Sequence, residues 1–345
     1  MNIKAFLNTI SRTARTLPIV IIYVTEGCNL KCVTCSYRKP LPNELSFEEI
    51  TELAETLAEF GLKHIVYSGG EPLLRRDFPE ICKVFASHGV KQTLLTNGLL
   101  LEKRIDDIRQ YFREIIVSMD GANPDTHNKI RGVNSFDLIL KGIAKSLTGD
   151  FRLQVSIRTV LQKQNFRELE GFIDLAKRTG INRISFLAAD VSSDAYGRDT
   201  RGAVADENQI ALNQNEIKEL RNIINSIAVK YEKYFASGLI SESPEKLHHI
   251  ADYYEALCSG GKIPFPKNFC NAPMVSAVIT STGNIHPCFF LPSYGNIRKN
   301  AFNELINSPA IINTRKQVKK MEPVRCKECV CTLYISPKNA LFDNF

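Results

Sequence analysis

The segment CNLKCVTC places three cysteines, Cys28, Cys32 and Cys35, close together in the chain. Thiolates are the ligands that soft metals and iron–sulfur clusters prefer. The C-x3-C-x2-C spacing is too dense for a structural zinc site, which usually draws on two separated cysteine pairs. Three thiolates match three corners of a 4Fe–4S cubane. The fourth iron would then be open to a small ligand, as one position of a catalytic metal site is.

More cysteines lie in the last quarter of the chain. Cys270 and Cys288 enclose Gly283 in a C-x12-G-x4-C pattern, and a C-x2-C pair follows at Cys326 and Cys329. The segment ITSTGNIHPCFF, which includes Cys288, is typical of a β-hairpin, with Gly283 and Asn284 at its turn. Two cysteine pairs around a hairpin fit tetrahedral zinc in a zinc ribbon.

Composition limits the classes to which the chain can belong. Its 345 residues include ten cysteines but no recognisable signal peptide, and the apolar run PIVIIYV is too short to cross a bilayer. Clustered cysteines without export favour metal over disulfides and indicate a cytoplasmic protein with no transmembrane segment. The net charge of +7 is mild. It permits an anionic substrate, and we expect no nucleic-acid partner.

The cysteine segment is the first of several polar stretches that follow predicted strands. From residue 19 onward, short apolar runs alternate with amphipathic helical patterns in six βα units, which predicts parallel strands with right-handed crossovers. Ligands of such sheets lie at the carboxyl ends of the strands. The cysteine loop, SGGEP, TNG and SMDG all fall at such ends. The predicted strands lie in PIVIIYV, HIVYSGG, KQTLLTNG, REIIVSMDG, RLQVSIRTV and NRISFLAAD.

CNLKCVTC followed one strand later by SGGEP resembles the motifs of the radical S-adenosylmethionine (SAM) superfamily. The resemblance covers about residues 19–190 and implies an α/β fold, a partial (β/α)6 TIM-like barrel. It also implies that Cys28, Cys32 and Cys35 hold a 4Fe–4S cluster whose open iron binds SAM. Such enzymes cleave SAM reductively to a 5′-deoxyadenosyl radical, which abstracts hydrogen from a substrate. Thr34 departs from the family, which usually has an aromatic residue before the third cysteine.

The resemblance also implies a set of residues that contact SAM. The glycines of SGGEP would let the backbone approach the methionine part, and Glu71 would accept a hydrogen bond from its ammonium group. An arginine on the fifth strand suits a carboxylate. TNG could instead be an ordinary turn, and Asp120 and Arg131 could be structural. The expected SAM-binding residues are Gly69, Gly70, Glu71, Pro72, Asn97, Ser118, Ser156, Arg158 and Leu187.

The second cysteine group resembles the twitch or SPASM extension of radical SAM enzymes, which carries auxiliary 4Fe–4S clusters. The resemblance implies a small C-terminal domain with one auxiliary cluster on Cys270, Cys288, Cys326 and Cys329. Cys258 and Cys331 compete for the last ligand position or are spare. A zinc ribbon, as a structural or docking module, is the alternative.

These observations predict four regions and a function. The predicted regions are an N-terminal helix (1–18), a radical SAM core (19–205), a helical connector (206–256) and a twitch- or SPASM-like domain (257–345). We expect a radical SAM oxidoreductase or maturase that acts in peptide modification or in natural-product or cofactor biosynthesis. A reductant such as flavodoxin or ferredoxin and a peptide or small-molecule substrate are its expected partners. The alternative is an iron–sulfur or zinc-ribbon protein for binding or electron transfer. Asp190, Asp194, Tyr196 and Arg198 are candidates for a general base.

Overall fold

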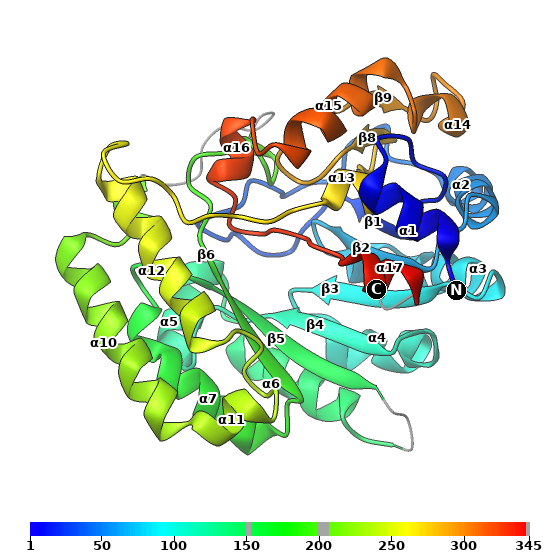
Figure 1. Cartoon of the computed structure of the whole chain (residues 1–345). Coiled ribbons are helices and arrows are strands. Elements are labelled where there is room, and N and C mark those ends of the chain that lie inside the picture. Colours follow the sequence, from blue (N-terminus) through cyan, green and yellow to red (C-terminus); the bar gives the residue numbers. More distant parts are fainter. Residues whose placement is uncertain (150–152, 199–206, 343–345) are drawn as a thin grey trace.

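The fold is organised around one nine-stranded sheet with the strand order β6-β5-β4-β3-β2-β1-β7-β8-β9. The computed structural model describes residues 1–149, 153–198 and 207–342. Six strands in chain order pair in parallel and are flanked by helices, as a partial barrel requires (Figure 1). These strands are β1 (Ile19–Thr25), β2 (His64–Gly69), β3 (Lys91–Thr96), β4 (Glu114–Ser118), β5 (Gln154–Leu161) and β6 (Arg183–Ala188). The predicted α/β partial barrel is confirmed.

Helices connect the parallel strands and cover the sheet. Leucine, isoleucine and phenylalanine side chains on the helices and strands form one large buried core. The S-x-x-E pattern at Ser46 and Glu49 is typical of a capping box, and one begins α2: Ser46 Oγ accepts from the backbone of Glu49, and Glu49 Oε2 accepts from the backbone of Ser46. The connecting helices are α2 (Phe47–Glu59), α3 (Phe78–Ser87), α4 (Leu101–Ile108), α5 (Pro124–Arg131), α6 (Phe136–Ser146) and α7 (Leu169–Thr179).

A helical segment covers the β6 edge of the sheet. Within it, α12 packs against α10 and β6, and Ile240 bridges to Ile184 of β6. The predicted boundary between core and connector, at residues 205 and 206, lies outside the described residues. The helices of this segment are α9 (Glu207–Ile210), α10 (Gln214–Lys230), α11 (Glu232–Ala236) and α12 (Pro244–Cys258).

The C-terminal region extends the same sheet. β7 (Ser276–Ile279) pairs in parallel with β1, and β8 (Asn284–His286) returns antiparallel to β7. Gly283 takes the left-handed conformation at the turn between them, with φ +83°, which confirms the predicted hairpin. β9 (Gly295–Asn296) then pairs with β8. The boundary at residue 257 stays a prediction, but core and tail share a continuous hydrogen-bonded sheet.

Short helices at both ends of the chain pack together. In α1 (Ile3–Ile10), Asn8 Nδ2 donates to the carbonyls of Thr16 and Met274, which ties the first segment to the tail. Figure 1 shows α1 beside α13 and α17. No helix in the described residues is long and apolar enough to span a bilayer. The remaining tail helices are α13 (Ala272–Val275), α14 (Phe302–Leu305), α15 (Pro309–Lys319), α16 (Val324–Lys327) and α17 (Pro337–Leu341).

Candidate active site

The three-cysteine loop lies at the carboxyl end of β1 and is held from two sides. The backbone N–H groups of Lys31 and Val33 donate to carbonyls at the end of α5, each at 3.0 Å. The N–H of Ser36 donates to the carbonyl of Tyr196 at 3.0 Å, in the segment that follows β6. The loop is therefore fixed by backbone hydrogen bonds to parts of the chain that are remote in sequence.

Each thiol of the loop faces a polar group. Asn97 Nδ2 lies 3.7 Å from Cys28 Sγ, and Arg131 Nη1 lies 3.7 Å from Cys32 Sγ. Cys35 Sγ lies 3.8 Å from the carbonyl oxygen of Tyr196. Burial raises the pKa of Cys28 and raises that of Cys35 to about 11, and the neighbouring cysteines add to both shifts. Binding of a metal to these thiols would therefore release protons.

Behind Cys32 lies a buried ion pair. Arg131 Nη2 is 2.9 Å from Asp120 Oδ2, with side-chain exposures of 11% and 4%. Asp120 also accepts from the backbone N–H of Val160 at 2.9 Å. Burial raises the pKa of Asp120 while the charge of Arg131 opposes that rise. The pair holds a guanidinium against the cysteine loop.

The glycines of SGGEP allow the end of β2 to lie directly against the cysteine loop. Gly69 has φ +113°, and a Cβ atom on Gly70 would lie 2.1 Å from the carbonyl oxygen of Gly27. The N–H of Gly70 donates to the carbonyl of Thr25 at 2.8 Å, and that of Glu71 donates to Gly27 at 2.7 Å. A side chain at Gly70 would push the two strand ends apart.

Glu71 is completely buried and links the ends of β2 and β3. Oε1 accepts from the backbone of Leu73 at 3.0 Å and from Thr96 Oγ1 at 2.8 Å, and Oε2 accepts from the backbone of Asn97 at 2.7 Å. Burial raises the pKa of Glu71 to about 7 although these hydrogen bonds lower it. The expected contact with an ammonium group stays a prediction, because the carboxylate already serves these three donors. Pro72 begins a 3-10 turn, Pro72–Leu74, in which Pro72 and Leu73 are buried and Leu74 is exposed.

The other expected SAM-binding residues are spread over the barrel. Ser118 ends β4 and pairs in register with Arg158 of β5. Ser156 Oγ donates to Glu114 Oε1 at 2.8 Å, toward the amino end of the sheet, so the structure does not bring it to the cysteine loop. Arg158 and Leu187 line a pocket that also contains Cys331. Contacts of these four residues with SAM stay predictions.

Five tail cysteines surround one cavity. Burial raises the pKa of Cys288 to about 11 and that of Cys326 to about 12, and each of these thiols lies near Cys270. Cys258, by contrast, is exposed at the end of α12 and its thiol donates to the carbonyl of Leu212 at 2.9 Å. The structure thus places Cys331, and not Cys258, with the predicted ligands. The cysteines that line the cavity are Cys270, Cys288, Cys326, Cys329 and Cys331.

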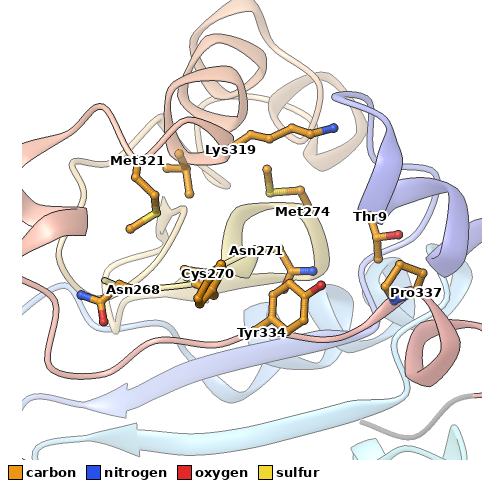
Figure 2. Close-up of a pocket in the computed structure, with 11 residues that line it drawn as sticks. Thr9, Asn268, Cys270, Asn271, Met274, Lys319, Met321, Tyr334 and Pro337 are labelled. Carbon is orange, nitrogen blue, oxygen red and sulfur yellow. The ribbon is translucent and has the colours of Figure 1, made fainter. Parts of the chain in front are cut away.

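Cys270 also faces outward. It also lines a second pocket, of about 240 Å³. Figure 2 shows Tyr334 and Met321 near Cys270 in this pocket, with Met274 of α13 above. Cys270 therefore forms part of the wall between the five-cysteine cavity and the molecular surface.

Three of the candidate general bases, Asp190, Tyr196 and Arg198, lie in the segment after β6, where Tyr196 faces Cys35 and Asp190 lines a pocket with Cys329. Asp190 forms a buried ion pair with Arg198 at 2.8 Å and accepts a short hydrogen bond from Ser193. Tyr196 has φ +61° and its ring lies edge-on to that of Phe290 in the tail. Burial raises the pKa of Tyr196. Asp190 and Arg198 thus neutralise one another in this structure.

Comparison with known families fits this geometry. Residues 22–176 match the family model "Radical SAM superfamily", and residues 270–330 match the model "Iron-sulfur cluster-binding domain", called SPASM. The chain belongs to the radical SAM superfamily. Its tail is a SPASM domain, and the protein is a radical SAM enzyme.

Relatives of this radical SAM enzyme differ in their named reactions. The chain is 28% identical to Fe-coproporphyrin III synthase of Methanosarcina barkeri, over 90% of this chain and 80% of that protein. It is 27% identical to GTP 3′,8-cyclase of Haemophilus influenzae, over 77% of this chain and 76% of the relative. The fold is similar to that of Streptococcus suis SuiB bound to precursor peptide SuiA, with a TM-score of 0.63 and 15% identity. That match covers 93% of this chain and 73% of SuiB.

The donor groups of this radical SAM enzyme fit iron–sulfur clusters. Among the described residues, no group of three or more Cys, His, Asp or Glu side chains could hold one metal ion. Each cysteine of a cubane binds a different iron, and thiolates are the ligands that such clusters use. Thiols that face a guanidinium and an amide N–H suit such an anionic cluster, because hydrogen bonds to cluster sulfur stabilise it.

Sequence reasoning left two parts of the radical SAM site open. The sequence allows Asp120 to be a turn residue and Arg131 to be a solvated or structural arginine, yet they form the ion pair behind Cys32. The signal for Asp120 is the position of SMDG at a strand end on the same edge of the sheet as the cysteine loop. The spacing of the cysteines alone does not decide whether Cys258 or Cys331 lies with the other tail cysteines.

Proposed function

We propose that Cys28, Cys32 and Cys35 hold the cluster at which SAM is reductively cleaved. The observation that carries this proposal is the contact of the three-cysteine loop with the glycines of β2. When bound, the cluster and SAM supply a one-electron cleavage whose adenosyl fragment removes a hydrogen atom from the substrate.

The residues around the loop would position these groups. Gly70 gives the backbone at the end of β2 a close approach, and Glu71 fixes the peptide that precedes the Asn97 side chain. Arg131 would face the cluster through Cys32 and offset part of its negative charge. We propose that Gly69 to Pro72, Asn97 and Ser118 form the SAM-binding surface.

We further propose one auxiliary 4Fe–4S cluster in the SPASM cavity, on Cys270, Cys288, Cys326 and Cys329. Cys331 lies beside these four thiols and is the alternative fourth ligand. A low-potential reductant such as flavodoxin or ferredoxin would supply the electron for SAM cleavage.

For the reaction, we propose hydrogen abstraction in cofactor biosynthesis as the first candidate. The two sequence relatives that support it are named for a porphyrin synthase and a nucleotide cyclase. Peptide modification is the second candidate, supported by the fold that the chain shares with SuiB in its complex with a precursor peptide.

The test is anaerobic SAM cleavage. Reconstituted protein with dithionite and SAM is expected to form 5′-deoxyadenosine, and Cys32→Ala to abolish the product while it keeps the auxiliary cluster. A wild-type protein that binds iron but never forms 5′-deoxyadenosine would be an iron–sulfur carrier instead.

Metal analysis tests the second cluster. Two cubanes require about eight irons per chain. A metal content of four irons and one zinc per chain would show that the tail holds a zinc ribbon and not an auxiliary cluster.

A further inference from the structure

A pocket of about 310 Å³ lies between the barrel and the SPASM cysteines. Arg158 of β5 and Leu187 of β6 form its barrel side, Tyr253 of α12 lies on another side, and Cys329 and Cys331 belong to its SPASM side. Its size is at the lower end of the range for small-molecule sites. Because Cys329 and Cys331 also line the five-cysteine cavity, a molecule in this pocket would lie next to the auxiliary site.

Arg158 is the cation inside this pocket, and most of its hydrogen-bonding capacity is unused. Nε donates to Ser185 Oγ at 3.1 Å. Within the described part of the chain, we find no ion pair of Arg158 and no hydrogen bond from its two terminal nitrogens. The guanidinium is half-buried, so these nitrogens present donors to the pocket. A guanidinium out of bulk water is the group that pairs best with a planar oxyanion.

The acidic residue of the pocket, Glu242, forms no ion pair with Arg158 or with any other described residue, and its Oε2 accepts from the backbone N–H of Phe186 at 2.9 Å. Burial raises the pKa of Glu242 while the charge of Arg158 opposes that rise, so the two groups interact across the pocket without a direct contact. Lys246 and Lys327 add positive charge at exposed positions of the lining. The pocket therefore has more cationic than anionic side chains in its lining, together with apolar walls from Leu187, Tyr253 and their neighbours.

We propose that Arg158 binds a carboxylate of the substrate and anchors that substrate beside the SPASM cysteines. This inference rests on the proposed function and changes the expected role of Arg158 from a SAM contact to a specificity-determining residue. One interior guanidinium balances one negative charge, whereas a phosphate dianion would require a second interior cation. The apolar walls suit a hydrocarbon body attached to the carboxylate. That carboxylate belongs to a small molecule or to an acidic side chain of a peptide.

The test is calorimetry on the full-length, anaerobically reconstituted protein without SAM, with 3-phenylpropionate as the probe. We expect the acid to bind at least tenfold more tightly than its neutral analogue 3-phenylpropionamide, and no less tightly than phenyl phosphate. Arg158→Gln should weaken binding of the acid at least tenfold. Arg167→Gln is the matched control, because Arg167 is exposed and paired with Glu219.

Three results would overturn the inference: equal binding of acid and amide, tighter binding of phenyl phosphate, or equal effects of the two variants. Loss of SAM affinity in Arg158→Gln with unchanged binding of the acid would also overturn it, in favour of a SAM contact. End-capped Ala-Glu-Ala and Ala-Gln-Ala separate the two carboxylate sources. Tighter binding of the Glu peptide than of 3-phenylpropionate assigns the carboxylate to a peptide, and weaker binding assigns it to a small molecule.

The same sample reports on the proposed function separately. 5′-Deoxyadenosine formation is measured with SAM and dithionite in the absence of probe. Carboxylate binding without any 5′-deoxyadenosine would remove the catalytic proposal and leave the anion site. Normal 5′-deoxyadenosine formation without selectivity for the acid would support the catalytic proposal and remove the anion site.

Discussion

Arg131 directs one end of its guanidinium at the sulfur of Cys32, at 3.7 Å, while the other end is fixed by Asp120. A buried cation in this position would favour the reduced state of a cluster bound to Cys32. Asp120 offsets the cost of burying the Arg131 charge, since an unpaired buried arginine would be strongly destabilising.

Removal of the Arg131 charge should therefore lower the midpoint potential of the cluster on this loop. A unit charge at about 6 Å interacts with about 3 kcal/mol at an effective dielectric constant of 20. Because Asp120 offsets part of this, we expect Arg131→Gln to shift the potential by on the order of 50 mV to more negative values. EPR-monitored redox titration measures the shift, and the signal that changes on SAM addition identifies the cluster. Arg131→Lys keeps the charge and should shift the midpoint potential less than Arg131→Gln does. Equal potentials in wild type and both variants would contradict the prediction.

Glu71 should be important for stability as well as for the site. Glu71→Ala leaves the N–H groups of Leu73 and Asn97 and the Thr96 hydroxyl without their acceptor in a buried region. Buried unsatisfied donors cost about 1–3 kcal/mol each, and water entry recovers part of that, so we expect a loss of about 2–4 kcal/mol. Urea unfolding at pH 8 measures it. Glu59→Ala, at an exposed position of α2, is the control, and a loss as small as in this control would show that the three hydrogen bonds are dispensable.

Gly70 tests the contact between the strand ends. In Gly70→Ala the new methyl group would meet the Gly27 carbonyl, which is backbone and cannot rotate away. We expect nearly complete loss of SAM cleavage with the fold retained. Gly89→Ala is the comparison, because nothing lies within 4 Å of its added methyl and only its φ of +69° is strained. That strain costs about 1 kcal/mol. Normal activity in Gly70→Ala would show that the two strand ends can separate without harm.

His127 should make stability depend on pH. It is fully buried on α5, and burial followed by the charge of Arg131 lowers its pKa from 6.5 to about 3. The unfolded chain thus binds a proton below pH 6.5 that the folded chain rejects, so stability is lost as the pH falls. When the pH falls from 7.5 to 5.5, the free energy of unfolding of wild type should decrease by about 1.4 kcal/mol more than that of His127→Gln. Urea titrations at both pH values measure this, with His88→Gln at an exposed position as control. Parallel pH profiles of wild type and His127→Gln would refute the prediction.

Iron analysis of cysteine variants distinguishes the tail cysteines that hold the auxiliary cluster from those that do not. Cys258 lies against Leu212, away from the five-cysteine cavity, so Cys258→Ala should keep the full iron content. Cys329→Ala should lose about four irons per chain. Iron loss in the Cys258 variant, or full iron in the Cys329 variant, would contradict the ligand set proposed for the auxiliary cluster.

Local patterns in the sequence predicted the parts of the molecule that depend on neighbours in the chain. Strand ends, the capping box of α2 and the turn at Gly283 follow from residues a few positions apart. The pairing of β7 with β1 joins segments more than 250 residues apart, and no periodicity carries that information. Alternation predicts the face of β5 on which Ser156 lies, but its partner Glu114 depends on the register with β4.

The same limit applies to the site. The motif around Cys28 predicted the ligands, whereas the partners of their sulfur atoms come from α5 and from the end of β3. Cys258 and Cys331 are equally plausible by spacing, and only the path of α12 separates them.

The shared sheet has a consequence for how this enzyme can be divided. β7 occupies the outer edge of β1, a seven-residue apolar strand that would otherwise present unpaired backbone groups to solvent. Removing the SPASM domain after α12 would open that edge directly below the cysteine loop, and the shortened chain should self-associate. Exchange of this domain between relatives would have to carry β7 with it, and a unit that begins before Cys270 does so, because Cys270 precedes β7 in the chain.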